Sequence, residues 1–221
     1  MMTSLRFSAL PKVGTYAKPT KGNGSPHLRM YETQPEGFPH PWYFVHRDNA
    51  PQGGVATVTV LENEKGEQVV RLLKIKRPPL GGKITLELPA GLWEKNESQL
   101  TCAKREVREE TGYDVTAAKM LTEHNLPNAQ GISSELTSFA LALVKGEKKG
   151  KDMREESEKS IIIGKLDVPI AVFADSTAFS KWLAEVSKQD YMVSREVFVA
   201  RALMPPLTNG KLTEKAFEAT A

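Results

Sequence analysis

The feature that most constrains this chain is a fourteen-residue segment, 98–111, that contains neither glycine nor proline. Ser98 belongs to the residue types that cap the N-terminus of a helix, and Gly112 stands where a left-handed residue commonly ends one. The segment therefore predicts a helix in the middle of the chain. Such a helix needs a sheet or another helix on which to bury its apolar side.

Most of the remaining segments with a clear pattern are predicted strands. Branched residues alternate with polar ones in short stretches that end at Gly, Pro or Asn, which is typical of half-buried strands. Strands are expected at 55–61, 69–76, 84–88, 137–144 and 161–168, and further helices at 177–189 and 194–204. This mixture predicts an α+β fold, a mixed β-sheet with helices packed on it. The charge-rich stretch 145–159 is expected to be a solvated loop.

Composition excludes several classes of protein. Of the 221 residues, 40% are hydrophobic and 26% are charged, so the chain can bury a sizeable core. A net charge of +3 is too small to favour a nucleic-acid partner, and no apolar run has the roughly 20 residues of a membrane span. The single cysteine, Cys102, excludes an internal disulfide and a Cys-rich zinc site. A reducing compartment fits, and we expect a cytoplasmic location.

The N-terminus suggests a second location. The first 31 residues contain no acidic residue but several Lys and Arg among Ser, Thr, Gly and Pro, as mitochondrial transit peptides do. Pro11, Gly14 and Pro19 interrupt the amphipathic helix that such a peptide needs, so a mitochondrial location is the alternative. Regular structure is expected to start near Trp42. We expect a flexible or dimer-forming extension over 1–40, a main domain over 41–204 and a polar tail over 205–221.

One edge of the predicted helix gathers carboxylates. Glu106 and Glu110 lie one turn apart, and Glu109 lies beside them. Like charges at this spacing destabilise a helix unless something neutralises them. Two explanations are open at this point. The acids either pair with neighbouring Lys and Arg on a solvated helix, or they hold a hard divalent cation, which prefers oxygen ligands.

The spacing around these glutamates resembles a known signature. Gly91, five residues, Glu97 and seven further residues lead to the run 105–113, REVREETGY, which together match the Nudix signature at its fixed and its class-restricted positions. Chance agreement is on the order of one in a million at the average usage of each residue type. The chain thus resembles the Nudix hydrolases, which cleave a nucleoside diphosphate linked to another group X. The resemblance implies a mixed sheet sandwiched between helices, an α/β/α arrangement.

The resemblance also implies roles for single residues. Glu106 and Glu110 match positions that bind Mg²⁺ in the family, with Mn²⁺ as the alternative metal. Glu109 belongs to the same acidic cluster, as a ligand or as an acid behind the ligands. Arg105 resembles the arginine that orients these carboxylates by ion pairing, and Glu97 resembles the acid that closes the loop–helix–loop.

The residues before the signature resemble the ADP-ribose and ADP-sugar pyrophosphatase branch. The run Glu87–Gly91 (ELPAG) implies that the Ala90 carbonyl is a metal ligand and that Glu87 lies at the substrate. Gly91 is expected to be needed for its small size or its backbone geometry. The run Leu72–Gly82 (LLKIKRPPLGG) implies that Arg77 contacts a phosphate or ribose of the substrate.

Residues 42–47 (WYFVHR) resemble a segment of this branch that binds adenine. In that segment a Trp stacks on the base and an Arg five residues later contacts the ligand, which implies these roles for Trp42 and Arg47. A position in the core is the alternative for Trp42. The branch has a second aromatic clamp, supplied by the partner subunit, for which only His27 or Tyr31 is available here.

The residues after the signature resemble the branch as well. Pro127 and the turn at Gly131 stand near the expected offsets. The branch places a catalytic glutamate in the loop before its last strand, where this chain has Glu155, Glu156 and Glu158. We expect Glu158 to be the catalytic one, and simple solvation of the loop is the alternative.

Taken together, the resemblance implies Mg²⁺-dependent hydrolysis of the diphosphate bond of ADP-ribose or a related ADP-sugar to AMP and a sugar phosphate. It implies a homodimer, and five aromatic residues crowded into 31–44 provide apolar area for such an interface. Neither a nucleic acid nor a membrane is expected as a partner. Two alternatives stay open: a Nudix pyrophosphatase for another nucleoside diphosphate derivative, and a non-catalytic sensor that binds ADP-ribose. The intact signature argues against the sensor.

Overall fold

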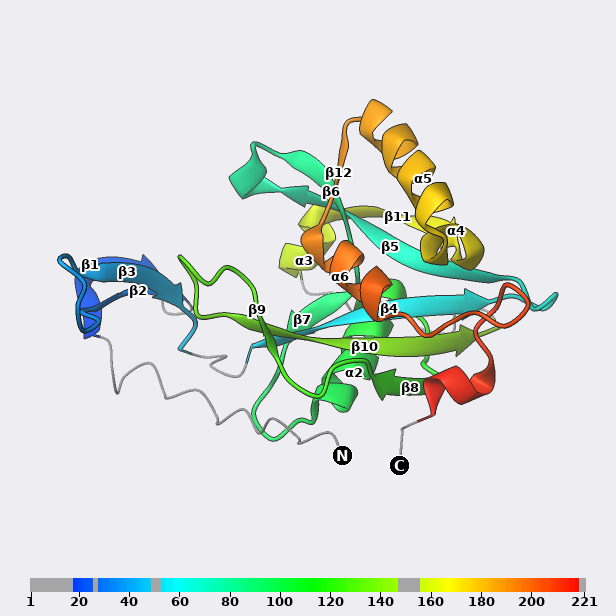
Figure 1. The fold of residues 1–221 in the computed structure, drawn as a ribbon, viewed down its shortest axis with the longest axis horizontal. Coiled ribbons are helices and arrows are strands. Elements are labelled where there is room, and N and C mark those ends of the chain that lie inside the picture. Colours follow the sequence, from blue (N-terminus) through cyan, green and yellow to red (C-terminus); the bar gives the residue numbers. More distant parts are fainter. Residues whose placement is uncertain (1–17, 26–27, 49–52, 147–155, 219–221) are drawn as a thin grey trace. The chain divides into compact units, whose positions relative to one another are not determined.

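The computed structural model describes residues 18–25, 28–48, 53–146 and 156–218. The chain divides into two compact units. The larger comprises Gly53–Leu126 and Thr137–Ala221, and the smaller comprises Met1–Gln52 and Pro127–Leu136. Figure 1 traces the chain through both. None of the described helices is long and apolar enough to cross a membrane.

The larger unit is built on a mixed sheet whose central strands run in the order β12-β6-β5-β4-β10-β8. Its strands are β4 (Gly54–Glu62), β5 (Gln68–Arg77), β6 (Lys83–Glu87), β7 (Ala90–Leu92), β8 (Ala117–Met120), β10 (Leu136–Lys145), β11 (Ile162–Pro169) and β12 (Tyr191–Val193), with the short β9 (Leu126–Pro127) paired to β10. The strand β4 pairs antiparallel with β5 and parallel with β10. With neighbours on both edges and helices on both faces, it carries a nearly continuous run of buried residues.

Helices cover both faces of this sheet (Figure 1). On one face Cys102, Ala103 and Val107 of α2 (Gln99–Thr111) pack against β4 and β10. The other face carries α4 (Ile170–Ala174), α5 (Ser176–Lys188) and α6 (Arg195–Leu203), whose apolar side chains join the largest core cluster. The alternation in β10 divides the two cores, because Ala140 faces α2 while Leu141 faces the opposite helices. The predicted α+β fold and its α/β/α arrangement are confirmed.

The C-terminal segment belongs to the core. A polar tail was expected from residue 205, yet Leu212 and Phe217 are buried among the side chains of the largest cluster. The Gln68 side chain fixes this segment, since its Nε2 donates to the Leu212 carbonyl at 2.9 Å and its Oε1 accepts from the Leu212 N–H at 2.8 Å. A 3-10 turn, η2 (Glu214–Phe217), follows. The apolar residues of this segment, such as Leu207, Leu212 and Phe217, are spaced irregularly among polar ones, which is too sparse a pattern to predict such burial.

The expected solvated loop over 145–159 is wrong at its C-terminal end. Residues Glu156–Ile161 form the short helix α3, and the following strand starts at Ile162 instead of Ile161. The start of this strand is fixed by packing, because Ile161 and Ile162 contact Leu73 and Ile75 of β5. Residues 147–155 lie outside the described part of the chain.

The smaller unit contains a three-stranded antiparallel sheet in the order β1-β2-β3. Its strands are β1 (Lys18–Ser25), β2 (Leu28–Thr33) and β3 (Trp42–His46). The expectation that regular structure starts near Trp42 is therefore wrong. The residues of β1 are mostly Gly, Lys and Pro and show no strand pattern. The strand forms because its backbone pairs with β2, and the register of this pairing shifts between Pro19 and Gly24.

Residues 127–136 complete the smaller unit beside β3. The Val45 N–H donates to the Ile132 carbonyl at 2.9 Å, and the Val45 carbonyl accepts from the Ser134 N–H at 3.1 Å. Inside the unit Tyr31 stacks on Phe44, with ring centroids 5.9 Å apart. This segment interrupts the larger unit in sequence yet pairs with the N-terminal strands.

Candidate active site

The helix α2 starts and ends as its sequence predicts. The Ser98 Oγ accepts a hydrogen bond from the Thr101 N–H at 3.1 Å, which satisfies one free donor of the first turn. Gly112 has a left-handed backbone (φ 77°), and its N–H donates to the Arg108 carbonyl at 2.8 Å. These caps fix where the glutamates of the last two turns lie.

Two of those glutamates are buried against the strand β7. Glu106 and Glu110 are only 5% and 6% exposed. The Ala90 N–H donates to the Glu110 Oε2 at 2.9 Å. A Cβ atom added to Gly91 would lie 1.8 Å from the Glu106 Oε1, so the glycine is needed for its small size. Its backbone φ is not positive, so small size, and not an unusual backbone conformation, is the reason for a glycine here.

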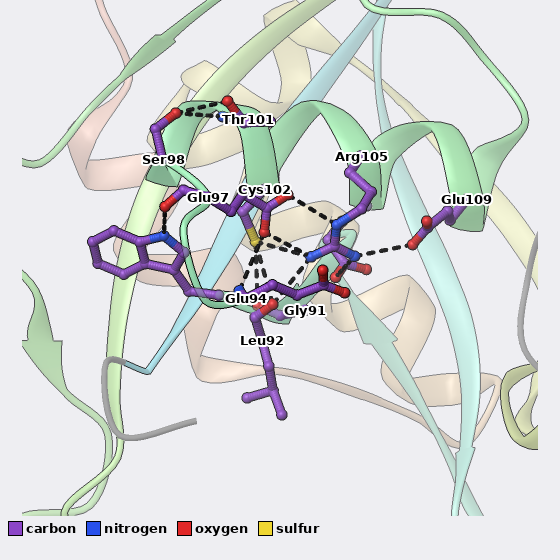
Figure 2. A network of polar contacts seen from close by, with 11 residues as sticks. Gly91, Leu92, Glu94, Glu97, Ser98, Thr101, Cys102, Arg105 and Glu109 are labelled. Carbon is purple, nitrogen blue, oxygen red and sulfur yellow. Dashed lines mark hydrogen bonds and ion pairs between the residues drawn. The ribbon is translucent and has the colours of Figure 1, made fainter. Parts of the chain in front are cut away.

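Arg105 binds the surrounding carboxylates into one network (Figure 2). Its Nε and Nη2 donate to the two Glu97 oxygens at 2.9 and 3.1 Å. Its Nη1 donates to the Glu106 Oε1 at 2.6 Å and to the Glu109 Oε2 at 3.1 Å. The Arg105 pairing raises the pKa of the guanidinium further and lowers the pKa of Glu97. The ion pairs implied by the resemblance are thus present.

Cys102 lies inside the same network without being available for chemistry. Its side chain is fully buried, and its Sγ lies 3.9 Å from the Gly91 carbonyl oxygen and 3.6 Å from that of Leu92. Burial raises the pKa of the thiol to about 12, helped by the charges of Glu106 and Glu97. The thiol stays protonated at neutral pH and is a poor metal ligand or nucleophile.

The chemistry of the donors fits a hard divalent cation. The charged groups that α2 places against Ala90 and Gly91 are the carboxylates of Glu110 and Glu106, the ligand type that such a cation prefers. In the described part of the chain, no three His, Cys, Asp or Glu side chains converge as a metal-binding group. Arg105 is the counter-ion of Glu106 and Glu109 here. A cation would therefore be held by Glu106 and Glu110 with the Ala90 carbonyl, once Glu106 turns away from Arg105.

Arg77 and Glu87 form a second paired group at the edge of the sheet. The Arg77 Nε and Nη2 donate to the two Glu87 oxygens at 2.7 and 2.5 Å, a bidentate geometry. The Thr85 hydroxyl donates to the same carboxylate. The hydrogen bonds with Glu87 raise the pKa of Arg77, and the negative charges of Glu87, Glu110 and Glu196 raise it further. Glu87 stands three residues before Ala90, whose N–H binds the Glu110 carboxylate, so this pair lies near the end of α2.

A pocket of about 280 Å³ opens beside this pair. Besides Arg77, Thr85 and Glu87, its lining includes Ser194 and Glu196 at the start of α6. Sequence reasoning did not select these two residues. They stand more than 100 positions after Glu87, and only the topology brings β12 beside β6.

The predicted adenine-binding residues lie in the smaller unit. Trp42 is 42% exposed, and its Nε1 donates to the Gly131 carbonyl at 2.9 Å, so it is not a core residue. Arg47 forms an ion pair with Glu135. Tyr31 is buried and its hydroxyl donates to the Asp48 Oδ1 at 2.6 Å, which leaves it unsuited to clamp a base. His27 lies outside the described residues.

Glu158 lies in α3, and its side chain is outside the described part of the structure. Its assignment as the catalytic glutamate stays a prediction. The same holds for the specific roles of the other predicted site residues, although the structure brings Glu97, Arg105, Glu106, Glu109 and Glu110 together.

Curated relatives match a limited part of the chain. Residues of this chain are 37% identical over 83 positions to the ADP-ribose pyrophosphatase of Saccharomyces cerevisiae, and 38% identical over 82 positions to the ADP-sugar pyrophosphatase of Mus musculus. Each match covers 36% of this chain and 36% or 37% of the relative. The chain therefore aligns with little more than a third of these proteins.

A solved structure and a family model agree with the fold. The crystal structure of an ADP compounds hydrolase superposes with a TM-score of 0.58, over 85% of this chain and 88% of that chain, at 15% sequence identity. This likeness concerns the fold alone. The family model described as the NUDIX domain matches residues 52–162, which is half of the 221 residues and includes the whole of α2 with its glutamates. The chain belongs to the Nudix family.

Proposed function

We propose that the protein hydrolyses the diphosphate bond of ADP-ribose or a related ADP-sugar, releasing AMP and a sugar phosphate. The observation that carries this proposal is the pair of buried glutamates, Glu106 and Glu110, held at one helix edge against Ala90 and Gly91. The names of the yeast and mouse relatives support the substrate class.

The metal proposed for this site is Mg²⁺, with Mn²⁺ as the alternative. Glu106, Glu110 and the Ala90 carbonyl would hold it. A bound divalent cation neutralises charge on the diphosphate and lowers the pKa of a bound water. Two buried carboxylates at one helix edge are stabilised by such a charge.

The residues of the chain itself position the reaction. Arg105 fixes Glu97 and Glu109 by hydrogen bonds, so that these two carboxylates keep one arrangement. Arg77, held by Glu87, presents a guanidinium at the edge of the site, where it orients the substrate. A carboxylate accepts the proton of the attacking water, and we assign this role to Glu158, with Glu109 as the second candidate. Water adds to one phosphorus, and the bridging oxygen leaves with the other phosphate.

The smaller unit is proposed to recognise the base. Trp42 exposes its ring for stacking on adenine, and Arg47 lies five residues further along the chain. We also propose a homodimer in which this segment completes the partner's adenine site. We further propose a cytoplasmic location, with the mitochondrion as the alternative.

A panel of diphosphates tests the activity. ADP-ribose, ADP-glucose, an oxidised nucleoside triphosphate and a dinucleoside polyphosphate are incubated with Mg²⁺ and scored for released monophosphate, with EDTA as the control. We expect the two ADP-sugars to be cleaved best. Cleavage of another member alone favours a pyrophosphatase for a different nucleoside diphosphate derivative. Tight ADP-ribose binding without turnover favours the sensor.

A further inference from the structure

The pocket beside Arg77 and Glu87 has a wall that the proposed mechanism does not use. It lies between the turn after β5, the end of β6 and the junction of β12 with α6. Its lining consists of Arg77, Pro79, Leu80, Thr85, Glu87, Met192, Val193, Ser194 and Glu196. Glu87 of the lining stands three residues before Ala90, whose N–H donates to the Glu110 Oε2 at 2.9 Å, so this pocket adjoins the carboxylates proposed to hold the metal.

The charges that line the pocket disfavour an anion. Arg77 is the one cation among the lining residues, and Glu87 engages its guanidinium with both oxygens. Glu196 adds a second carboxylate, which forms an ion pair with Arg195 at 3.1 Å. Arg195 is about half exposed, and such a pair is screened by water. A phosphate group placed here would meet two carboxylates and a guanidinium that is already neutralised.

The remaining groups suit an uncharged molecule with hydroxyls. The Ser194 Oγ is buried and has no hydrogen-bond partner among the described residues. Ser194 precedes α6 at its N-cap position without making the side-chain capping bond, so rotation of its hydroxyl towards a ligand breaks no protein contact. Pro79, Leu80 and Met192 form an apolar wall, and the last two are 45% and 46% exposed. Hydroxyls beside an apolar wall match the two kinds of surface that a sugar presents.

We propose that this pocket receives the group X on the far side of the diphosphate, that it accepts an uncharged sugar, and that it rejects a phosphorylated or acidic one. Ser194 hydrogen-bonds a sugar hydroxyl, and Glu196 repels an anionic substituent. The inference rests on the proposed function, because it assumes a substrate in which a sugar follows the diphosphate.

The test compares ADP-ribose with ADP-ribose that carries a phosphate on its terminal ribose. We expect the wild type to have a kcat/KM at least tenfold higher for the unphosphorylated compound. Glu196→Lys reverses one charge at the pocket and should move this ratio by roughly tenfold or more towards the phosphorylated compound. Ser194→Ala should raise the KM for ADP-ribose about 3- to 10-fold with little change in kcat. The matched control is Glu185→Lys, because Glu185 is an exposed residue of α5 outside the lining.

Equilibrium binding separates this inference from the proposed activity. Calorimetry with both compounds, in the presence of Ca²⁺, measures their dissociation constants without turnover. If the wild type cleaves neither compound yet binds ADP-ribose at least tenfold more tightly, the activity is wrong and the pocket assignment stands. If the two compounds bind equally, or Glu196→Lys leaves their ratio unchanged in a protein with wild-type thermal stability, the pocket assignment is overturned.

Discussion

Glu110 is held by a backbone donor of the strand it faces, which makes it suited to bind a cation in a fixed position. Its Oε2 accepts from the Ala90 N–H, and its side chain is almost fully buried. Glu110→Gln keeps the shape and an oxygen acceptor but removes the charge. We expect turnover to fall by roughly two orders of magnitude or more, with thermal stability close to that of the wild type.

The control for this substitution is Glu64→Gln in the exposed turn between β4 and β5, which should behave as the wild type. Metal-dependent release of AMP from ADP-ribose is the measurement. Activity within a few-fold of wild type in well-folded Glu110→Gln protein would exclude Glu110 as a metal ligand.

Gly91 is needed because the Glu106 carboxylate lies against it. An added methyl group would meet the Glu106 carboxylate, so Gly91→Ala should move that carboxylate while leaving the strand β7 intact. We expect activity to fall at least tenfold, since a displacement of about 1 Å can cost a hundredfold in rate. Gly164→Ala is the matched control, because its added Cβ would meet only the Lys74 side chain, at 3.5 Å. Equal activities of the two variants would contradict this reading of Gly91.

At this scale the sequence predicted one group of residues well and missed another. Glu97, Arg105 and Glu106 lie within ten positions of each other on one loop and helix, so helical geometry places them. Ser194 and Glu196 reach the site through the pairing of β12 with β6, and such long-range pairing leaves no spacing pattern in a sequence. Arg77 and Glu87 were selected but not paired, because their contact crosses from β5 to β6 and depends on how those two strands align.

At the scale of elements, the C-terminal end of α2 is held by a lysine that lies 54 positions later in the sequence. The Lys165 Nζ on β11 donates to the carbonyl of Thr111, the last residue of α2, at 2.6 Å. A cation at this end also interacts favourably with the helix dipole. We expect Lys165→Met to lower the free energy of unfolding by about 1–2 kcal/mol, as measured by urea denaturation.

Lys188→Met provides the comparison for Lys165. Lys188 forms an exposed ion pair with Glu185 at 2.7 Å, and its loss should change stability by less than about 0.5 kcal/mol. A loss for Lys165→Met no larger than this would show that the contact with Thr111 contributes little to the stability of α2.

The elements that the sequence predicted best are those with two independent signals. The helix over 98–111 combines a cap at each end with an apolar stripe, and its boundaries agree with α2 to one residue. The strand β1 has neither alternation nor apolar residues to reveal it. It forms because its backbone groups pair with β2, and that information lies in the partner strand.

At the scale of the whole molecule, the smaller unit carries exposed aromatic area. Phe38, Trp42 and Tyr43 are between 42% and 50% exposed. We expect a homodimer at micromolar concentration, because apolar area of this kind commonly marks an interface. Sedimentation measures the mass, and a monomer with full activity would contradict the proposal.

Complementation tests whether the active sites of such a dimer are shared. Glu110→Gln protein lacks the proposed metal ligand, and Trp42→Ala/Arg47→Ala protein lacks the proposed base-binding residues. If each site uses both subunits, mixing the two weakly active proteins should restore part of the wild-type rate. Mixing two preparations of Glu110→Gln protein is the control, and the same rate in both mixtures would show that each site is built by one chain.

Because residues 127–136 pair with β3 through hydrogen bonds, the N-terminal strands are joined to the later part of the chain by these contacts as well as by the covalent backbone. A protease that nicks the chain once between Asp48 and Gly53 leaves the fragment that carries β3 bonded through Val45 to Ile132 and Ser134. The nicked protein should migrate as one species in a native gel and as two bands in detergent. A protein that starts at residue 53 would lack β3, and residues 127–136 would lose the strand with which they pair.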